Sequence, residues 1–164
     1  MTAGSTATAW IFKANPHEWD LRAYLTALHS GREDADLVWL VNRYADDISA
    51  GDRVYLWSAS GDKQAGVVAL ARATGPVADL LEDKTKYRAP EFADKYEGLR
   101  QRVPLRVERV LRKPLTKVQI QHNSDLKAQL AGLSILRFYT QGTNYPVQSP
   151  EEAALDAACL KLSA

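Results

Sequence analysis

The segment GDRVYLWSASGDKQAGVVALARA, residues 51–73, decides the fold of this chain. Gly51 and Asp52 form a turn, and residues 53–57 form a compact apolar strand directly after it. Residues 58–63 carry the Ser, Gly and Asp chemistry of a hairpin turn, and residues 64–73 return as a second apolar strand. The sequence therefore predicts two neighbouring antiparallel strands.

Toward the N-terminus, two further apolar runs flank a helix. Residues 9–13 predict a strand that ends at the turn formed by Asn15 and Pro16. Asp20 can cap a helix that stops at Gly31. Its apolar positions recur at helical spacing: Leu21, Tyr24, Leu25 and Leu28. After an acidic turn, residues 37–41 form another compact apolar segment.

On the other side of the hairpin, a polar stretch precedes one more strand. Residues 74–101 are polar and basic and predict a long loop with a helical turn near residues 92–96. Residues 102–108 alternate apolar and polar side chains, which places Val103, Leu105 and Val107 on one face of a strand. Pro104 predicts an edge position, because proline cannot donate a ladder hydrogen bond.

The remainder of the chain predicts mainly helices. Residues 117–123 fit either a short strand or a loop, and residues 125–130 fit a short helix with Gly132 just past its end. Residues 149–152, Ser-Pro-Glu-Glu, predict a capping box with proline at the first helical position. Its apolar stripe continues through Leu155, Cys159 and Leu162. The fold class is therefore α+β, a small twisted β-barrel of mostly antiparallel strands with flanking helices.

Length and composition indicate one domain. The chain has 164 residues, 46% of them apolar, and we place the domain at residues 9–164 after a flexible N-terminus of residues 1–8. No apolar run approaches the roughly 18 residues of a membrane span, and the N-terminus lacks a signal-peptide pattern, so we expect a cytoplasmic protein without membrane contact. The single cysteine, Cys159, excludes an internal disulfide and predicts a core position.

Charge is unevenly distributed along the chain. Residues 84–117 carry 11 basic and 4 acidic residues, whereas residues 1–83 carry 7 and 12, and residues 118–164 carry 3 and 4. Such a basic stretch suits a surface that meets phosphates. The alternative is a solvated loop that contains Lys84, Lys86, Arg88 and Lys95.

Four motifs occur in the order seen in one known family: WIFKANP at 10–16, Trp39 followed by Arg43, GDRVYLW at 51–57, and SILRFYTQGTNYP at 134–146. On these motifs the chain resembles the EVE family of the PUA-like group over roughly residues 9 to 160. The family often has proline just before the Gln-Gly-Thr-Asn segment, where this chain has Tyr139 and Thr140. The resemblance implies a small β-barrel with a pocket for one flipped base, as in the related YTH readers of methylated adenine in RNA.

Base recognition needs aromatic faces and a few fixed polar groups. A base that stacks on an aromatic ring gains about 1–3 kcal/mol. Trp39 matches the tryptophan that walls the pocket of the YTH readers and is the expected stacking residue, although its apolar neighbours also fit a core position. Trp57 is a candidate second wall, with Trp19 and Tyr139 as alternatives.

Two polar segments are expected at the same pocket. Lys13, Ala14 and Asn15 leave the first strand where the pocket of the family opens; Asn15 can read a base edge and Lys13 can reach a phosphate, although Asn-Pro also fits ordinary turn chemistry. In residues 141–144, glycine permits an unusual turn, and the polar groups can converge on a ligand or brace the loop itself. These residues are Gln141, Gly142, Thr143 and Asn144.

Two arginines are candidate phosphate clamps. Arg43 and Arg137 carry guanidinium forks that match phosphate oxygens, unless they pair with Asp46 or Asp47. The expected partner is nucleic acid that carries a modified base, with a modified cytosine in DNA favoured over RNA. Any downstream action would require a separate effector protein, and the sequence defines no oligomeric state.

The usual motifs of an enzyme are absent from the sequence. His17, His29 and His122 are scattered, and no nucleophile elbow or phosphate-binding or dinucleotide loop occurs, so we expect neither catalysis nor a metal or other cofactor. An alternative is an amidohydrolase of a modified nucleoside, on a scaffold that resembles the ASCH branch, with Lys13 as base and Thr143 as nucleophile. A third hypothesis is a protein-interaction module.

Overall fold

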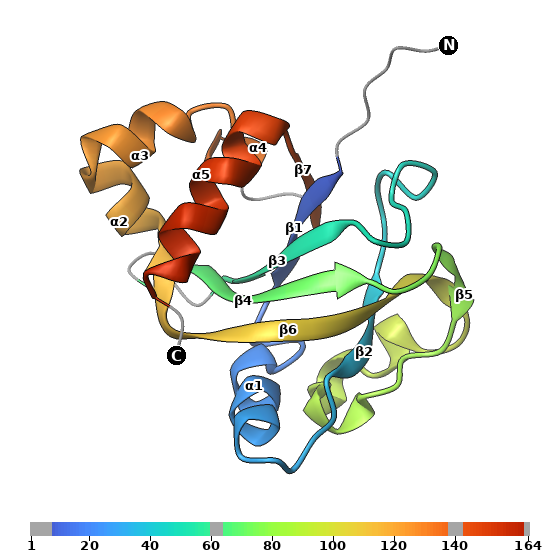
Figure 1. The fold of residues 1–164 in the computed structure, drawn as a ribbon. Helices are drawn as coiled ribbons and strands as arrows, with labels where there is room; N and C mark the ends of the chain where they lie inside the picture. The colour runs from blue at the N-terminus through green and yellow to red at the C-terminus, as the bar shows by residue number, and fades with distance from the viewer. Residues whose placement is uncertain (1–7, 60–63, 138–142, 163–164) are drawn as a thin grey trace.

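One mixed sheet organises the molecule (Figure 1). The computed structural model describes residues 8–59, 64–137 and 143–162. The strands in these residues are β1 Ala9–Ala14, β2 Asp36–Leu40, β3 Arg53–Ser58, β4 Gly66–Ala73, β5 Ala78–Leu80, β6 Arg100–Thr116 and β7 Asn144–Val147. The α-helices are α1 Leu21–His29, α2 Lys117–His122, α3 Ser124–Gln129, α4 Ser134–Arg137 and α5 Ser149–Leu160. Three short 3-10 helices are η1 Thr85–Tyr87, η2 Pro90–Phe92 and η3 Asp94–Tyr96.

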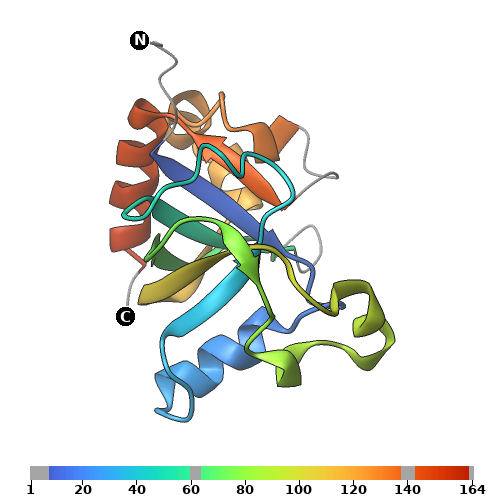
Figure 2. The same cartoon turned by 90° about the vertical axis from the view of Figure 1, so that its right-hand side faces the viewer.

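The sheet follows the order β2-β6-β4-β3-β1-β7, and β5 pairs with the first part of β6. The predicted antiparallel pair is confirmed as β3 and β4, with Val54 opposite Ala71; its turn, residues 60–63, lies outside the described residues. β1 runs parallel to β3 and antiparallel to β7, so the sheet is mixed. It curls into a half-barrel, and the predicted α+β class is confirmed (Figures 1 and 2).

The two faces of the sheet bury two separate apolar clusters. Alternation along β3 sends Val54 and Leu56 into the first cluster and Tyr55 and Trp57 into the second. α1 covers the first cluster, and α2 to α5 gather over the second (Figure 2). Cys159 lies in the second cluster with no exposed surface, as predicted. No helix in the described part of the chain is long and apolar enough to cross a membrane.

Residues 117–122 form a helix, so the expectation of a strand or loop for this segment was wrong. Thr116 and Gln119 make a capping box: the Gln119 N–H donates to Thr116 Oγ1 at 3.0 Å, and the Thr116 N–H donates to Gln119 Oε1 at 2.9 Å. The apolar side of this helix buries Ile120. A Thr-x-x-Gln signature therefore marked the helix start in the sequence.

The final helix is confirmed, but it begins at Ser149, one residue earlier than predicted, because its capping box lies one residue earlier. Gln148 is the N-cap and pairs with Glu151, whose carboxylate accepts from the Gln148 N–H at 3.1 Å. Pro150 is consequently at the second helical position. Glu151 turns inward, and Gly132 leaves room for its carboxylate because a Cβ at that position would touch it.

β6 lies between β2 and β4, which corrects the edge position predicted from Pro104. Pro104 is opposite Val38 of β2, whereas on its other side β4 has already ended at the pair Ala73 and Leu105. The Pro104 carbonyl accepts from Thr74 N–H at 2.9 Å, just past that end. The missing proline N–H therefore interrupts no pair of the β4 ladder.

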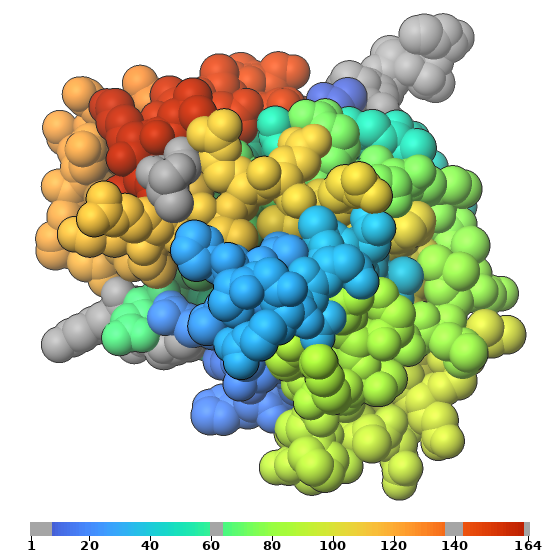
Figure 3. Space-filling model, turned by 60° about the horizontal axis from the view of Figure 1, so that its bottom comes forward, coloured from blue at the N-terminus to red at the C-terminus, as the bar shows by residue number. Residues whose placement is uncertain are grey.

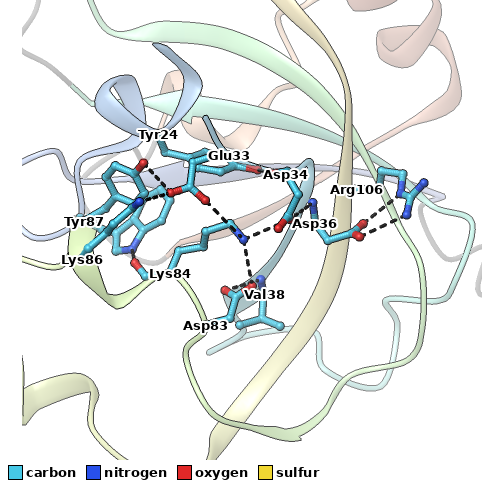
Figure 4. A network of polar contacts seen from close by, with 11 residues as sticks. Tyr24, Glu33, Asp34, Asp36, Val38, Asp83, Lys84, Lys86, Tyr87 and Arg106 are labelled. Atoms are coloured by element: carbon cyan, nitrogen blue, oxygen red, sulfur yellow. Dashed lines mark hydrogen bonds and ion pairs between the residues drawn. The ribbon is translucent and has the colours of Figure 1, made fainter. Parts of the chain in front are cut away.

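Residues 81–97 are attached by ion pairs to the loop after α1 (Figure 4) and to Glu18 before this helix. Lys84 Nζ lies 3.1 Å from Asp34 and 3.7 Å from Asp83. Lys86 and Lys95 pair with Glu33 and Glu18, and Arg88 pairs with Glu82. The side chains of Lys84 and Arg88 are only 11% exposed. These two residues therefore fit neither of the sequence-based expectations, which were a basic surface that meets phosphates and a solvated loop. Figure 3 shows α1 and its following loop between β6 and this segment.

Candidate functional site

Asn144 joins the two ends of the sheet, β2 and β7. Its Oδ1 accepts from the Asn42 backbone N–H at 3.0 Å, and its Nδ2 donates to the Leu40 carbonyl at 3.3 Å. The Lys13 N–H donates to the Thr143 carbonyl at 2.8 Å. The ends of β1 and β2 and the start of β7 therefore meet at one place.

A pocket of about 420 Å³ lies at this junction. This volume is within the range of roughly 300–1,000 Å³ that small-molecule sites occupy. Its lining comes from the end of β1 and the residues that follow it, from β2 and Asn42 just after it, from Thr143 just before β7, and from residues 82–96. The lining residues are Lys13, Ala14, Asn15, Glu18, Trp19, Val38, Trp39, Leu40, Asn42, Glu82, Arg88, Lys95, Tyr96 and Thr143.

Two tryptophans form the aromatic part of the lining. Trp39 and Trp19 are 7% and 9% exposed, with ring centroids 6.2 Å apart and planes at 63°. Trp39 also packs on Phe12, with centroids 6.1 Å apart, so it belongs to the first apolar cluster as well as to the pocket. Trp19 Nε1 donates to the Lys84 carbonyl at 3.1 Å, which fixes its ring.

Glu18 connects this aromatic wall to the outer wall formed by residues 82–96. Its carboxylate accepts from the Tyr96 hydroxyl and, at 3.2 Å, from the Lys95 ammonium. Burial alone would raise the pKa of Glu18, but these hydrogen bonds hold that pKa below its usual value. Arg88 stacks on the Tyr96 ring at 3.8 Å and donates to the Glu18 carbonyl at 2.9 Å. The outer wall is therefore ordered by charged contacts.

Arg102 supports the outer wall from behind. It is 1% exposed, and its guanidinium donates to the carbonyls of Gly98 at 3.0 Å, Tyr96 at 2.7 Å and Leu80. Burial lowers the pKa of this guanidinium. One side chain at the start of β6 thus holds both ends of the segment that carries Glu82, Arg88 and Tyr96.

The polar residues at the pocket make turn contacts as well. Asn15 Oδ1 accepts from the His17 N–H at 3.0 Å, which is the turn chemistry expected of Asn-Pro. The Thr143 hydroxyl lies 3.2 Å from Asn42 Oδ1 and 3.1 Å from Asn144 Oδ1. The Lys13 ammonium lies 5.8 Å from the Tyr145 ring centroid, and burial lowers its pKa.

The structure brings five of the predicted site residues to the pocket: Lys13, Ala14, Asn15, Trp39 and Thr143. Trp57 does not line the pocket, because alternation along β3 turns it into the second cluster; Trp19 provides the second ring. Asn144 is fully buried and braces the strand junction, and Arg43 is exposed outside the lining. Tyr139, Gln141, Gly142 and the side chain of Arg137 lie outside the described residues.

Sequence reasoning missed the outer wall. Glu82, Arg88 and Tyr96 reach the pocket from a segment distant in sequence from β1 and β2, and no motif marks them. One signal in the sequence could have predicted it: residues 1–83 are acidic and residues 84–117 are basic, so ion pairs between the two segments could be expected. In the described part of the chain, no group of three or more His, Cys, Asp or Glu side chains could hold a metal ion.

Comparison with known proteins shows the fold. No protein-family model and no curated protein sequence matches the chain. A hypothetical protein from Leishmania major has a similar structure, with a TM-score of 0.65 and 19% identity over 98% of each chain. The DUF55 domain of human thymocyte nuclear protein 1 has a TM-score of 0.60 and 13% identity over 92% of this chain and 97% of that one. The chain has the fold of the DUF55, or EVE, domain.

This DUF55 fold confirms the architecture that the EVE resemblance implied. Human THYN1 in complex with DNA that contains 5-methylcytosine is also similar, with a TM-score of 0.62 and 12% identity over 92% of this chain and 96% of that one. At such low identity the likeness concerns the fold. The chemistry of the pocket has to be argued from the residues of this chain.

Proposed function

We propose that this DUF55-fold protein binds DNA that carries a modified base and takes that base, flipped from the duplex, into the pocket beside Trp39. The observation that carries the proposal is the pairing of two tryptophans, with ring planes at 63°, with polar groups around one pocket of about 420 Å³. A flipped base needs an aromatic face and a polar edge, and the pocket offers both.

The energetics require an aromatic wall. Extruding a base costs a few kcal/mol of stacking and pairing, and stacking in the pocket returns about 1–3 kcal/mol. Asn15, Asn42 and Thr143 present donors and acceptors that can pair with the edge of the base. The complex of human THYN1 with 5-methylcytosine DNA supports a modified cytosine as the first ligand to test.

The test is a binding series with duplexes that differ in one central base: cytosine, 5-methylcytosine or 5-hydroxymethylcytosine, with matched RNA. Fluorescence anisotropy of end-labelled oligonucleotides gives each dissociation constant. We expect the parent protein to prefer one modified duplex by about tenfold or more, since about 1.4 kcal/mol of extra stacking gives that ratio. Equal affinity for all of the oligonucleotides would overturn the proposal.

Trp39→Leu and Trp57→Leu form a matched pair of variants. Both tryptophans are nearly buried, at 7% and 2% exposure, so both variants should lose stability through cavities. Only Trp39→Leu should lose the preference for the modified base, because only Trp39 lines the pocket. Melting curves establish that both variants are folded at the assay temperature. A Trp39→Leu protein that discriminates like the parent would show that Trp39 is only core.

A second candidate is the amidohydrolase, because the fold places carboxylates in the same pocket as the proposed lysine and threonine. Glu18 and Glu82 line the same pocket as Lys13 and Thr143. Both carboxylates are, however, engaged with Tyr96, Lys95 and Arg88. Chromatography of modified nucleosides incubated with the protein separates the two functions: a reader leaves the nucleoside intact, whereas a hydrolase releases a product that Thr143→Ala would abolish.

A further inference from the structure

A second groove, of about 640 Å³, lies between α1 and β6. It shares no lining residue with the pocket beside Trp39. One wall is a single face of α1, with residues at helical spacing: Arg22, Leu25, Thr26 and His29. The other wall and the floor are Val68, Val110, Leu111, Arg112 and Pro114.

A bulge in β6 creates the second wall. Val67 of β4 is opposite Leu115 and Ala69 is opposite Val110, so residues 111–114 of β6 face Val68 alone. Pro114 cannot donate to a ladder, and the backbone N–H groups of Arg112 and Lys113 turn instead to the Leu162 carbonyl, at 2.7 and 3.5 Å. Arg112 therefore lies in an irregular part of β6, where it lines the groove together with residues of α1.

Arg22 has buried hydrogen-bond donors with no partner in the described part of the chain. Its Nε and Nη2 atoms are shielded from solvent and make no hydrogen bond there. These two atoms form one edge of the guanidinium, and their N–H bonds point the same way. That edge matches two oxygens of one phosphate or carboxylate group. A buried, unpaired guanidinium edge is unfavourable, and a bound oxyanion would remove that cost.

The other lining residues favour an anion of more than one charge. Arg112 adds a second guanidinium, and Thr26 adds a hydroxyl donor near the exposed end of His29. The lining contains no Asp or Glu among the described residues. Val68 and Leu111 give the floor an apolar surface, and the groove is larger than a single phosphate group needs.

We propose that this groove binds a small molecule in which a phosphate group is joined to an apolar group such as a ring. On binding, the partly exposed Arg22 side chain turns its Nε–H and Nη2–H edge out of its shielded position to hold two phosphate oxygens. Arg112 supplies the second positive charge, and the apolar part of the ligand lies on Val68 and Leu111. The site is independent of the proposed base pocket, so either can fail without the other.

Phenyl phosphate is the probe, because it joins a phosphate group to an apolar ring. Titration calorimetry at fixed ionic strength should show one site per chain, and the probe should raise the melting temperature, as any ligand of the folded state does. Phenol and inorganic sulfate at equal concentration are the controls for the ring alone and for anions in general. Both should bind at least about tenfold more weakly, since each lacks part of the recognition.

Arg22→Gln removes the charged edge, and Arg32→Gln, an exposed arginine just after α1, is its matched control. We expect Arg22→Gln to weaken phenyl phosphate by about tenfold or more, while Arg32→Gln leaves affinity unchanged. Without the probe, the melting temperature of Arg22→Gln should be equal to or above that of the parent, because an unpaired buried charge has been removed. If Arg22→Gln does not fold, Arg22→Lys keeps the charge without the fork and should bind less tightly.

Several results would overturn the proposal. These are the absence of a calorimetric and melting response in the parent, equal binding by Arg22→Gln, and an Arg22 Nε–H resonance in NMR that does not move on titration. Displacement of phenyl phosphate by an unmodified duplex, together with weaker duplex binding by Arg22→Gln, would overturn the small-molecule assignment and identify the phosphate as one of the DNA backbone.

Discussion

At the scale of single residues, position on the pleat decides which aromatic side chain can meet a ligand. Trp39 and Trp57 are similar in exposure and both follow apolar neighbours, but they enter different clusters. Tyr55 and Trp57 share one face of β3, and Val54 and Leu56 share the other. Period-two alternation could have grouped Trp57 with Tyr55 from the sequence, whereas which face carries the pocket depends on strand pairing across the whole chain.

Cys159 offers a residue-scale test of the second cluster. It has no exposed surface, and burial raises the pKa of its thiol to about 12, so the native protein holds neither an accessible nor an ionised thiol at pH 8. A thiol reagent such as DTNB should therefore leave the folded protein unlabelled and react fully once urea unfolds it. Stoichiometric labelling of the native protein within mixing time would contradict this placement.

At the scale of elements, the sequence predicted those whose signals are local. The hairpin strands, α1 with its Asp20 cap and α5 follow from patterns of fewer than about fifteen residues, and the structure confirms them, with the start of α5 one residue earlier than predicted. The parallel pairing of β1 with β3 and the inner place of β6 depend on contacts between distant segments. The sequence predicts only a long loop with one helical turn for residues 74–101, because ion pairs and Arg102, rather than apolar periodicity, order residues 81–97.

Arg102 is a positioning residue for this segment, and its replacement tests that role. Arg102→Met keeps an unbranched apolar stem but leaves the carbonyls of Leu80, Tyr96 and Gly98 without their donor. At about 1–3 kcal/mol for each unsatisfied buried group, we expect a loss of about 3 kcal/mol or more in the free energy of unfolding, measured by urea denaturation. Binding of modified DNA should also weaken, because the outer wall of the pocket loses its support.

Two further variants separate positioning from general destabilisation. Arg102→Lys can still donate to some of the three carbonyls and should recover part of both losses. Arg72 of β4 forms an exposed ion pair with Glu108 of β6. Arg72→Met removes this pair, so it should lower the free energy of unfolding by no more than about 1 kcal/mol and leave DNA affinity intact. If the Arg102→Met protein binds modified DNA as tightly as the parent, Arg102 does not position the outer wall for binding.

At the scale of the whole molecule, the two proposed sites lie on elements that we expect to exchange amide hydrogens more readily than the centre of the sheet. β3 and β4 are inner strands whose residues are buried on both faces except Arg53 and Arg72, whereas η1, η2 and η3 bury no residue. Amides of β3 and β4 should exchange hydrogen only through global unfolding, and amides of residues 85–97 through local opening at a lower free energy.

The two ligands should slow hydrogen exchange in different regions. The preferred modified DNA should slow exchange at residues 85–97 and β2, and phenyl phosphate should slow it at α1 and residues 111–114. In each titration, β3 and β4 should slow only by the amount that ligand linkage adds to global stability. Protection of both regions by one ligand would mean that the two sites are coupled through α1, which carries Arg22 of the groove and begins two residues after Trp19 of the pocket.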